Sequence, residues 1–155
     1  MQGGDGIAAN DGCRSQLNRP HAVHAILTVG KRYVLQLRDN KPDISAPGMW
    51  SLFGGLLEEG EAPSEALVRE IHEELMIELV DYRHLWSFER WSHYFEKLVD
   101  FTFFASDISE LWKSCNLMEG QAIEQFDYQD LCGLDMPDIP REVLDRHHRE
   151  FGHLS

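Results

Sequence analysis

Three glutamates within five residues, Glu70, Glu73 and Glu74, are the side chains of this 155-residue chain whose type and spacing best fit a chemical role. In an α-helix, which turns by about 100° per residue, they fall within roughly 100° of one another. Carboxylates so close on one face repel each other and destabilise the helix. A divalent cation, which prefers hard oxygen ligands, would offset that repulsion. The spacing predicts a metal-binding helix face, with a solvated acidic face as the alternative.

The apolar residues of the same segment indicate how this helix is held. They lie on a neighbouring stripe, centred roughly 120° from the glutamates, which is typical of a helix packed on a core. The stripe consists of Leu67, Val68, Ile71 and Leu75. Pro63 suits a first helical turn, so we expect the helix to run from there to about Leu75. One face is structural and the next is available for chemistry.

The residues around the glutamates are spaced in a specific way. Gly55 is followed after five residues by Glu61 and, after seven more, by residues 69–77, which read REIHEELMI. This arrangement resembles the signature of the Nudix hydrolase family: Gly, five residues, Glu, seven residues, Arg-Glu, apolar, any, Glu-Glu, any, Gly, apolar. Eight of the nine specified positions are filled, and the exception is Met76, where the family has glycine.

The resemblance implies an α/β fold, the family's α/β/α sandwich with a mixed β-sheet between helices. It also implies a hydrolase that uses Mg²⁺ or Mn²⁺ to cleave a diphosphate bond. The substrate would be a small nucleoside diphosphate derivative such as an NTP, an NDP-sugar or a dinucleoside polyphosphate. The alternative is a Nudix-fold module that binds or senses a nucleotide without cleaving it. Such members usually lose an acidic position of the motif, and none is lost here.

The resemblance also assigns roles within the motif. It implies metal ligation by Glu70, Glu73 and Glu74, and by the backbone carbonyl of Gly54, which precedes the motif's first glycine. Gly55 is expected to allow close approach of the substrate, because a residue without Cβ leaves room for a ligand. Family members differ in which carboxylate acts as the base. We expect it to be Glu70, with Glu73 as the next catalytic candidate.

Three further charged residues are carried over from the family. Glu61 and Arg69 are expected to pair and to brace the loop against the helix behind the metal ligands. Residues 118–121, Met-Glu-Gly-Gln, resemble the Glu-Gly-Gln loop of MutT-type members, whose glutamate reaches the metal cluster or acts as base. Glu119 is therefore a further ligand and catalytic candidate, and an ordinary loop glutamate is the alternative.

Two residues outside the motif are candidates for binding the substrate. Arg38 ends a β-type run and could bind a phosphate through two N–H groups, or form a surface ion pair with Asp39 or Asp43. Tyr94 lies near the position where dinucleoside polyphosphate hydrolases carry a base-stacking tyrosine. The aromatic residues around it could instead belong to the core or to a sheet face.

Two positions depart from the family pattern near the motif. Met76 would need a left-handed turn that costs a residue with Cβ roughly 1 kcal/mol, so we predict either a slightly extended helix or a mildly strained cap. Phe53 stands where many members have proline, which can reshape the loop entering the site.

Late in the chain, between Asp130 and Asp145, no asparagine matches the one that reads an oxidised guanine in MutT-type enzymes. A dedicated 8-oxo-dGTP hydrolase is therefore disfavoured.

The rest of the chain reads as one domain over residues 19–155, preceded by a flexible tail over residues 1–18 that is rich in Gly, Asn and Asp. Strands are expected at 21–29, 31–37, 50–53, 82–90, 96–105 and 121–126, and helices at 63–75, 128–133 and 141–151. Strands interleaved with helices predict a sheet covered by helices. His147 and His148 are expected at an exposed helix end, with metal binding as the alternative.

Composition limits the class of partner. The net charge of −13 argues against binding nucleic acid through its phosphates, because that needs a basic face. No apolar run approaches a membrane span, and the N-terminus lacks a secretory signal pattern, so we expect a cytoplasmic protein without membrane contact. Three cysteines without Cys-x-x-Cys spacing are expected to be free thiols. A monomer and a homodimer both remain open.

Overall fold

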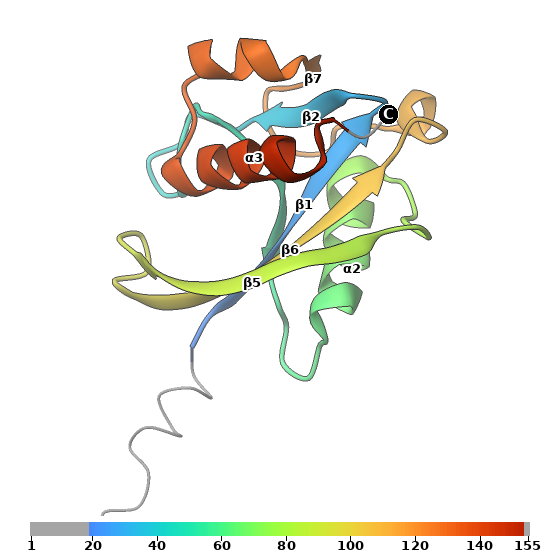
Figure 1. Cartoon of the computed structure of the whole chain (residues 1–155). Coiled ribbons are helices and arrows are strands. Elements are labelled where there is room, and N and C mark those ends of the chain that lie inside the picture. The colour runs from blue at the N-terminus through green and yellow to red at the C-terminus, as the bar shows by residue number, and fades with distance from the viewer. Residues whose placement is uncertain (1–18, 154–155) are drawn as a thin grey trace, which may run out of the picture.

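The computed structural model describes residues 19–153, so the tail expected over residues 1–18 lies outside the described residues. Seven strands form one mixed sheet with a helix on each face (Figure 1), which is the expected α/β/α sandwich. The strands are β1 (His21–Val29), β2 (Arg32–Leu37), β3 (Trp50–Ser51), β4 (Phe53–Leu56), β5 (Arg83–Ser92), β6 (Lys97–Asp107) and β7 (Ala122–Phe126). The helices are α2 (Pro63–Leu75), α3 (Asp138–Phe151) and the 3₁₀ helices η1 (Trp112–Ser114) and η2 (Tyr128–Gly133).

Strand β1 organises the sheet. One edge pairs in parallel with β6 along almost its whole length. The other edge is shared, because residues 22–25 pair antiparallel with β4 and residues 27–29 pair antiparallel with β2. The sharing places the short strand β4 beside the start of β1. The two consecutive glycines of β4, Gly54 and Gly55, thereby lie opposite His24 and Val23.

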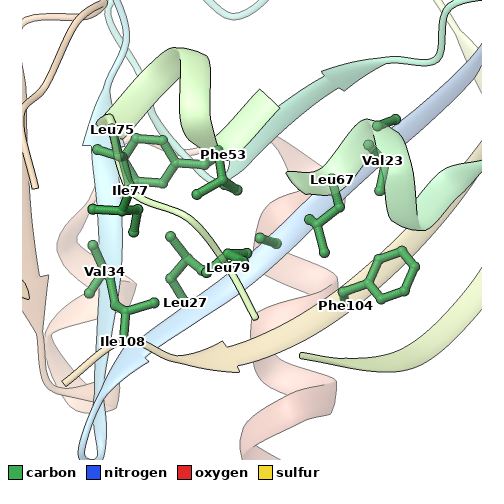
Figure 2. Close-up of a cluster of buried hydrophobic side chains, with 13 residues drawn as sticks. Val23, Leu27, Val34, Phe53, Leu67, Leu75, Ile77, Leu79, Phe104 and Ile108 are labelled. Atoms are coloured by element: carbon green, nitrogen blue, oxygen red, sulfur yellow. The ribbon is translucent and has the colours of Figure 1, made fainter. Parts of the chain in front are cut away.

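Alternation along β1 sends its side chains to two cores. Val23, Ala25 and Leu27 point to the face covered by α2, where they join Leu67 and other buried residues of that helix (Figure 2). The apolar stripe of α2 is therefore buried as its spacing predicts. Full burial of one such aliphatic side chain contributes roughly 1.5–3 kcal/mol, so this stripe fixes the rotation of the helix about its axis. The glutamates on the neighbouring face are aimed by that packing.

The opposite face of the sheet is covered by α3. Its buried residues Val143 and Leu144 pack in a second cluster with Leu35 and Phe103. His147 belongs to the same buried side of α3, and its Nδ1 lies 2.8 Å from the hydroxyl oxygen of Tyr33. The expectation that His147 is exposed at a helix end is therefore wrong. A tyrosine hydroxyl on the neighbouring strand makes its burial tolerable, because a buried polar atom needs a hydrogen-bond partner.

Most expected elements are present, three of them differ from the expectation, and η1 is an additional short helix. The strand expected over residues 50–53 is two strands, since β3 pairs with β2 and β4 pairs with β1, and β4 continues through Gly54 and Gly55 to Leu56. The segment 128–133 is a 3₁₀ helix. Helix α3 begins at Asp138, ahead of the expected Arg141, because Pro140 lies in its first turn, where no intrahelical N–H donor is required.

Helix α2 ends in a left-handed residue. Met76 has φ 58° and ψ 30°, and its backbone N–H donates to the carbonyl oxygen of His72 at 2.9 Å. Of the two alternatives for this departure from the family pattern, the extended helix is excluded and the strained cap is present. In residues 19–153, none of the helices has the length and apolar character needed to cross a membrane.

Candidate metal and diphosphate site

The three glutamates of α2 differ in their surroundings. Glu74 is buried, with 9% of its surface exposed, while the Glu70 carboxylate is mostly covered and that of Glu73 is half-exposed. Oε2 of Glu74 accepts a hydrogen bond from the backbone N–H of Gly54 at 3.1 Å. The helix is thereby joined to β4 at Gly54, the residue whose carbonyl the family resemblance suggests as a metal ligand.

The glycines of β4 are required by close contacts. A Cβ on Gly54 would overlap the carbonyl oxygen of Val23, and its φ of 150° is unfavourable for any other residue. A Cβ on Gly55 would overlap the carboxylate of Glu70. Glycine within a strand often marks such close approach. Gly55 therefore lets the Glu70 carboxylate lie directly against the backbone of β4, and Gly54 lets β4 pair closely with β1.

The electrostatics of this contact are unfavourable without a cation. Burial raises the pKa of Glu74 to about 8, and the charges of Glu70 and Glu119 add to the effect. Burial also raises the pKa of Glu70, against the lowering effect of its hydrogen bond with Arg69. Buried carboxylates this close need positive charge to remain ionised. The donor atoms are all oxygen, the type that Mg²⁺ and Mn²⁺ prefer, so the residues present fit a divalent cation.

Arg69 supplies positive charge to these carboxylates in the structure. Its guanidinium bonds Glu61 at two points, Nε to Oε2 at 2.7 Å and Nη2 to Oε1 at 2.9 Å. Its Nη1 reaches Glu70 at 2.9 Å and Glu73 at 3.3 Å, and Nη2 also donates to the carbonyl oxygen of Leu56 at 3.0 Å. These contacts raise the pKa of Arg69 and lower that of Glu61 to about 2. The side chain thus ties the loop after β4 to the acidic face of α2.

The expected ligands do not converge on one point. Across residues 19–153, no three acidic, histidine or cysteine side chains are arranged to surround a cation. The contacts explain this, since Arg69 engages Glu70 and Glu73 while Glu74 is turned to the N–H of Gly54. A cation would have to replace Arg69 at one or both of the carboxylates that it holds.

Glu119 is brought to the same region by its loop. The backbone N–H of Met118 donates to the carbonyl oxygen of Glu74, and that of Gln121 donates to the carbonyl oxygen of Leu37, at 2.9 and 2.7 Å. The loop therefore connects the end of α2 to the end of β2. The exposed side chain of Glu119 lies close enough for its charge to raise the pKa of Glu74.

A pocket of about 530 Å³ opens on the α3 side of β4 and is lined in part by Gly54, Gly55 and Arg38. Nε of Arg38 donates to the carbonyl oxygen of Ser45 at 2.8 Å. The positive charge of Arg38 acts to lower the pKa of both Glu74 and His24. Arg38 therefore borders the pocket and is close enough for its charge to act on the buried carboxylate. Asp39 is one of the two carboxylates considered as surface partners of Arg38. Its Oδ2 lies 3.6 Å from Nζ of Lys41 instead.

Tyr94 lies outside this lining. It occupies the turn between β5 and β6, is 55% exposed, and donates its hydroxyl to the carbonyl oxygen of Asp43 at 3.0 Å. Its neighbours His93 and Phe95 do line the pocket. Tyr94 therefore links the hairpin turn to the loop over residues 38–49. The nearby Trp86 is a core residue, as the alternative interpretation holds.

The pocket also contains residues that the sequence analysis did not single out. His24 of β1 lies beside Phe101 and Phe103 of β6, and all three line the pocket. Burial and the charge of Arg38 lower the pKa of His24 to about 4, so the ring is neutral at pH 7. A signal existed in the alternation of β1, which places His24 on the face opposite Val23 and Ala25.

The sequence model described as the NUDIX domain matches residues 18–147 of this chain. The chain belongs to the Nudix hydrolase family. Several solved Nudix structures share its fold. A MutT protein from Methanosarcina mazei Go1 is 22% identical, with 86% of this chain and 96% of that chain covered at a TM-score of 0.71. The dihydroneopterin triphosphate pyrophosphohydrolase of E. coli is 21% identical, with 83% and 94% covered at 0.66.

A third Nudix structure was solved with a ligand. The NUDIX domain of NrtR from Shewanella oneidensis, in complex with ADP ribose, is 15% identical, with 97% of this chain and 99% of that chain covered at a TM-score of 0.72. At such identities these likenesses establish a shared Nudix fold.

Proposed function

We propose that this Nudix hydrolase is a Mg²⁺- or Mn²⁺-dependent pyrophosphohydrolase that cleaves the diphosphate bond of a nucleoside diphosphate linked to another group. The observation that carries the proposal is the contact of Glu70 and Glu74 with the two glycines of β4. These glycines also line the 530 Å³ pocket, so one short strand separates the acidic face from a space of small-molecule size.

The cation would be held by oxygen donors from three segments. These are the carboxylates of Glu70, Glu73 and Glu74 on α2, the carbonyl of Gly54 on β4 and the carboxylate of Glu119. When bound, divalent cations neutralise phosphate oxygens, orient the diphosphate and lower the pKa of water. Glu73, whose contact with Arg69 is the longer one at 3.3 Å, would exchange this partner for the cation, while Glu70 would keep its contact at 2.9 Å.

The remaining steps fall to residues of the chain. Arg38, which lines the pocket, would donate N–H groups to a phosphate of the substrate. Gly55 lets the carboxylate of Glu70 lie against β4, where the diphosphate would be bound. Burial raises the pKa of the Glu70 carboxyl, which makes it a better proton acceptor at neutral pH, and we assign it the role of base toward the attacking water. Arg69 and Glu61 position Glu70 from behind.

The reaction adds one water across a P–O–P bridge. The water oxygen bonds to one phosphorus, the bridging P–O bond breaks, and the proton of the water passes to Glu70. Both products then carry a phosphate group. Most of the rate enhancement in phosphoryl transfer comes from positioning the reactants and stabilising charge on the phosphate oxygens. In this proposal both would take place at the edge of β4.

The double variant Glu73→Gln/Glu74→Gln tests the proposal. It should lose metal-dependent hydrolysis of every compound in a panel of dNTPs, NDP-sugars, dinucleoside polyphosphates and nicotinamide or flavin dinucleotides, while its circular dichroism spectrum stays unchanged. The matched control is Glu78→Gln/Glu110→Gln, which removes the same charge from exposed positions outside the site. Undiminished hydrolysis in the first double variant would contradict the assignment.

A second candidate is a binding module that recognises a nucleotide without cleaving it. The likeness to the NrtR domain in complex with ADP ribose favours keeping this alternative. All acidic positions of the motif are retained here, which favours the enzyme. Calorimetry on the same panel separates the two, because tight binding without product from the bound compound supports the binding module.

A further inference from the structure

The floor of the 530 Å³ pocket is a row of aromatic rings on two neighbouring strands. His24 of β1 pairs in register with Phe103 of β6, and Phe101 lies two residues before Phe103 on the same strand. The ring centroids of His24 lie 5.7 Å from Phe103 and 6.1 Å from Phe101, with interplanar angles of 22° and 26°. The rings therefore stand nearly parallel to one another across the sheet.

This stacking determines what the pocket presents to a ligand. Side chains of a strand stand roughly perpendicular to the sheet, so rings stacked from strand to strand turn their edges toward the pocket. Ring edges carry partial positive charge and favour the π face of another aromatic ring in an edge-to-face contact. A flat heteroaromatic group laid over Phe101 and Phe103, with its edge beside His24, would match this floor.

His24 differs from its neighbours in being polar. Its Nδ1 is buried and has no hydrogen-bond partner within residues 19–153. On the same face of β1 its neighbours Ala22 and Ile26 are apolar, and the rings beside it are phenylalanines. An unsatisfied buried nitrogen costs on the order of 1–3 kcal/mol, which a phenylalanine at this position would avoid. The packing of the floor alone does not account for a histidine.

The enclosed nitrogen also indicates which tautomer the ring adopts. A neutral imidazole carries one N–H, and an N–H at Nδ1 would be a buried donor without an acceptor. Orphaned buried N–H groups are rarer than orphaned acceptors, so the proton belongs on Nε2. Because Nδ1 is enclosed, Nε2 is the ring nitrogen available to a ligand in the pocket. His24 therefore presents a donor.

The position of the pocket indicates which part of the substrate reaches His24. Gly54, Gly55 and Arg38 line the end of the pocket that adjoins the carboxylates of α2. A diphosphate placed there would direct its attached nucleoside over the aromatic floor. The volume suits a nucleoside, since pockets for small molecules span roughly 300–1,000 Å³.

We infer that His24 is a specificity-determining residue, which donates a hydrogen bond from Nε2 to an acceptor atom on the edge of a nucleobase that lies over Phe101 and Phe103. This inference rests on the proposed function, because the diphosphate must occupy the strand edge at Gly54 and Gly55. A carbonyl oxygen or a ring nitrogen of the base would serve as acceptor, and an amino group would not.

The experiment compares His24→Phe with the matched control His84→Phe, an exposed histidine outside this pocket. His24→Phe keeps a ring on the floor and removes the N–H. For the best nucleotide substrate, kcat/KM should fall about 10- to 100-fold, the range for one lost hydrogen bond to substrate. For 5-phosphoribosyl pyrophosphate, which has a diphosphate and no base, it should change less than about 2-fold. The control should change neither.

A second readout does not depend on turnover. The ¹⁵N shifts of the His24 imidazole should report the Nε2–H tautomer in the free protein, and Nε2 should shift when the preferred nucleoside monophosphate is added. Equal losses for the two substrates, or an unperturbed Nε2 with bound nucleotide, would overturn the inference. Absence of all metal-dependent hydrolysis in the wild-type protein would instead contradict the proposed function, and the shifts would still test His24.

Discussion

The guanidinium of Arg69 holds the carboxylate of Glu61 at two points, with Nε 2.7 Å from Oε2 and Nη2 2.9 Å from Oε1. The same guanidinium reaches Glu70 and the carbonyl oxygen of Leu56. One side chain thus joins the end of β4, the loop that follows it and the acidic face of α2. The planar fork of arginine suits this set of contacts, and the single ammonium of lysine does not.

The variant Arg69→Lys should therefore lose activity while it keeps its charge. We expect kcat to fall on the order of 10- to 100-fold and the apparent Mn²⁺ affinity to weaken, as is typical when a residue that orients metal ligands is replaced. Steady-state kinetics over a Mn²⁺ titration measure both. The control is Arg146→Lys, because Arg146 forms an exposed ion pair with Glu150 at 2.9 Å. Equal kinetics in the two variants would contradict the positioning role.

The variant Gly55→Ala tests the contact between β4 and α2. The added Cβ would overlap the Glu70 carboxylate, which must then move. We expect at least about a 100-fold loss of kcat, the scale on which small misplacements of reacting groups act. Gly133→Ala is the control, since a Cβ there meets open space at an ordinary φ. A fully active Gly55→Ala would show that Glu70 need not occupy this place during the reaction.

The stability of the metal-free protein should decrease as the pH rises toward 8. The pKa of Glu74 is about 8 in the folded chain and about 4.5 when unfolded, so the folded state binds more protons between these values. The free energy of unfolding then falls by up to about 1.4 kcal/mol per pH unit. Urea titrations with EDTA at pH 7 and pH 8 measure this slope.

Glu74→Gln should remove most of this slope, and Mg²⁺ at pH 8 should stabilise the wild-type protein more than the variant. Glu78→Gln is the matched control, because Glu78 is exposed and should leave the slope unchanged. Identical slopes for the wild-type and Glu74→Gln proteins would show that Glu74 ionises normally in the fold.

The variant Met76→Gly should stabilise the chain. Met76 holds φ at 58°, which costs a residue with Cβ roughly 1 kcal/mol, and its side chain is half-exposed, so little burial is lost. The greater chain entropy of glycine when unfolded offsets part of this gain, which leaves about 0.5 kcal/mol. Chemical denaturation measures it. Met76→Ala keeps the strain and should bring no comparable gain, and a gain as large in the alanine variant would exclude strain as the cause.

Local patterns predict α2 well because its determinants lie within one segment. The stripe around Leu67 and Ile71 specifies the buried face, and Pro63 marks the start. Strand β4 is harder to predict from the sequence, because Gly54 and Gly55 have low strand propensity. Their pairing partners on β1 also lie about thirty positions away in the chain.

The details of the site depend on contacts that no short pattern encodes. The approach of His24 to Phe101 and Phe103 follows from the parallel pairing of β1 with β6, which a helix and several strands separate in sequence. The hydrogen bonds of Arg69 to Glu70 and Glu73 depend on which rotamers these side chains adopt. The glutamates could therefore be named from the sequence, while their present partners could not.

Strands β4 and β2 share one edge of β1, and this fixes the number of residues in some segments of the chain but not in others. A residue inserted between Ser51 and Gly54 would shift β4 by one position and turn its side chains to the opposite face. The loop over residues 38–49 is closed at its base by the N–H of Arg38 on the carbonyl oxygen of Met49, and lengthening such a loop costs little. Ser45 and Ala46 of this loop line the pocket. Insertions there would give the chain a way to acquire new substrates while the carboxylates of α2 stay in place.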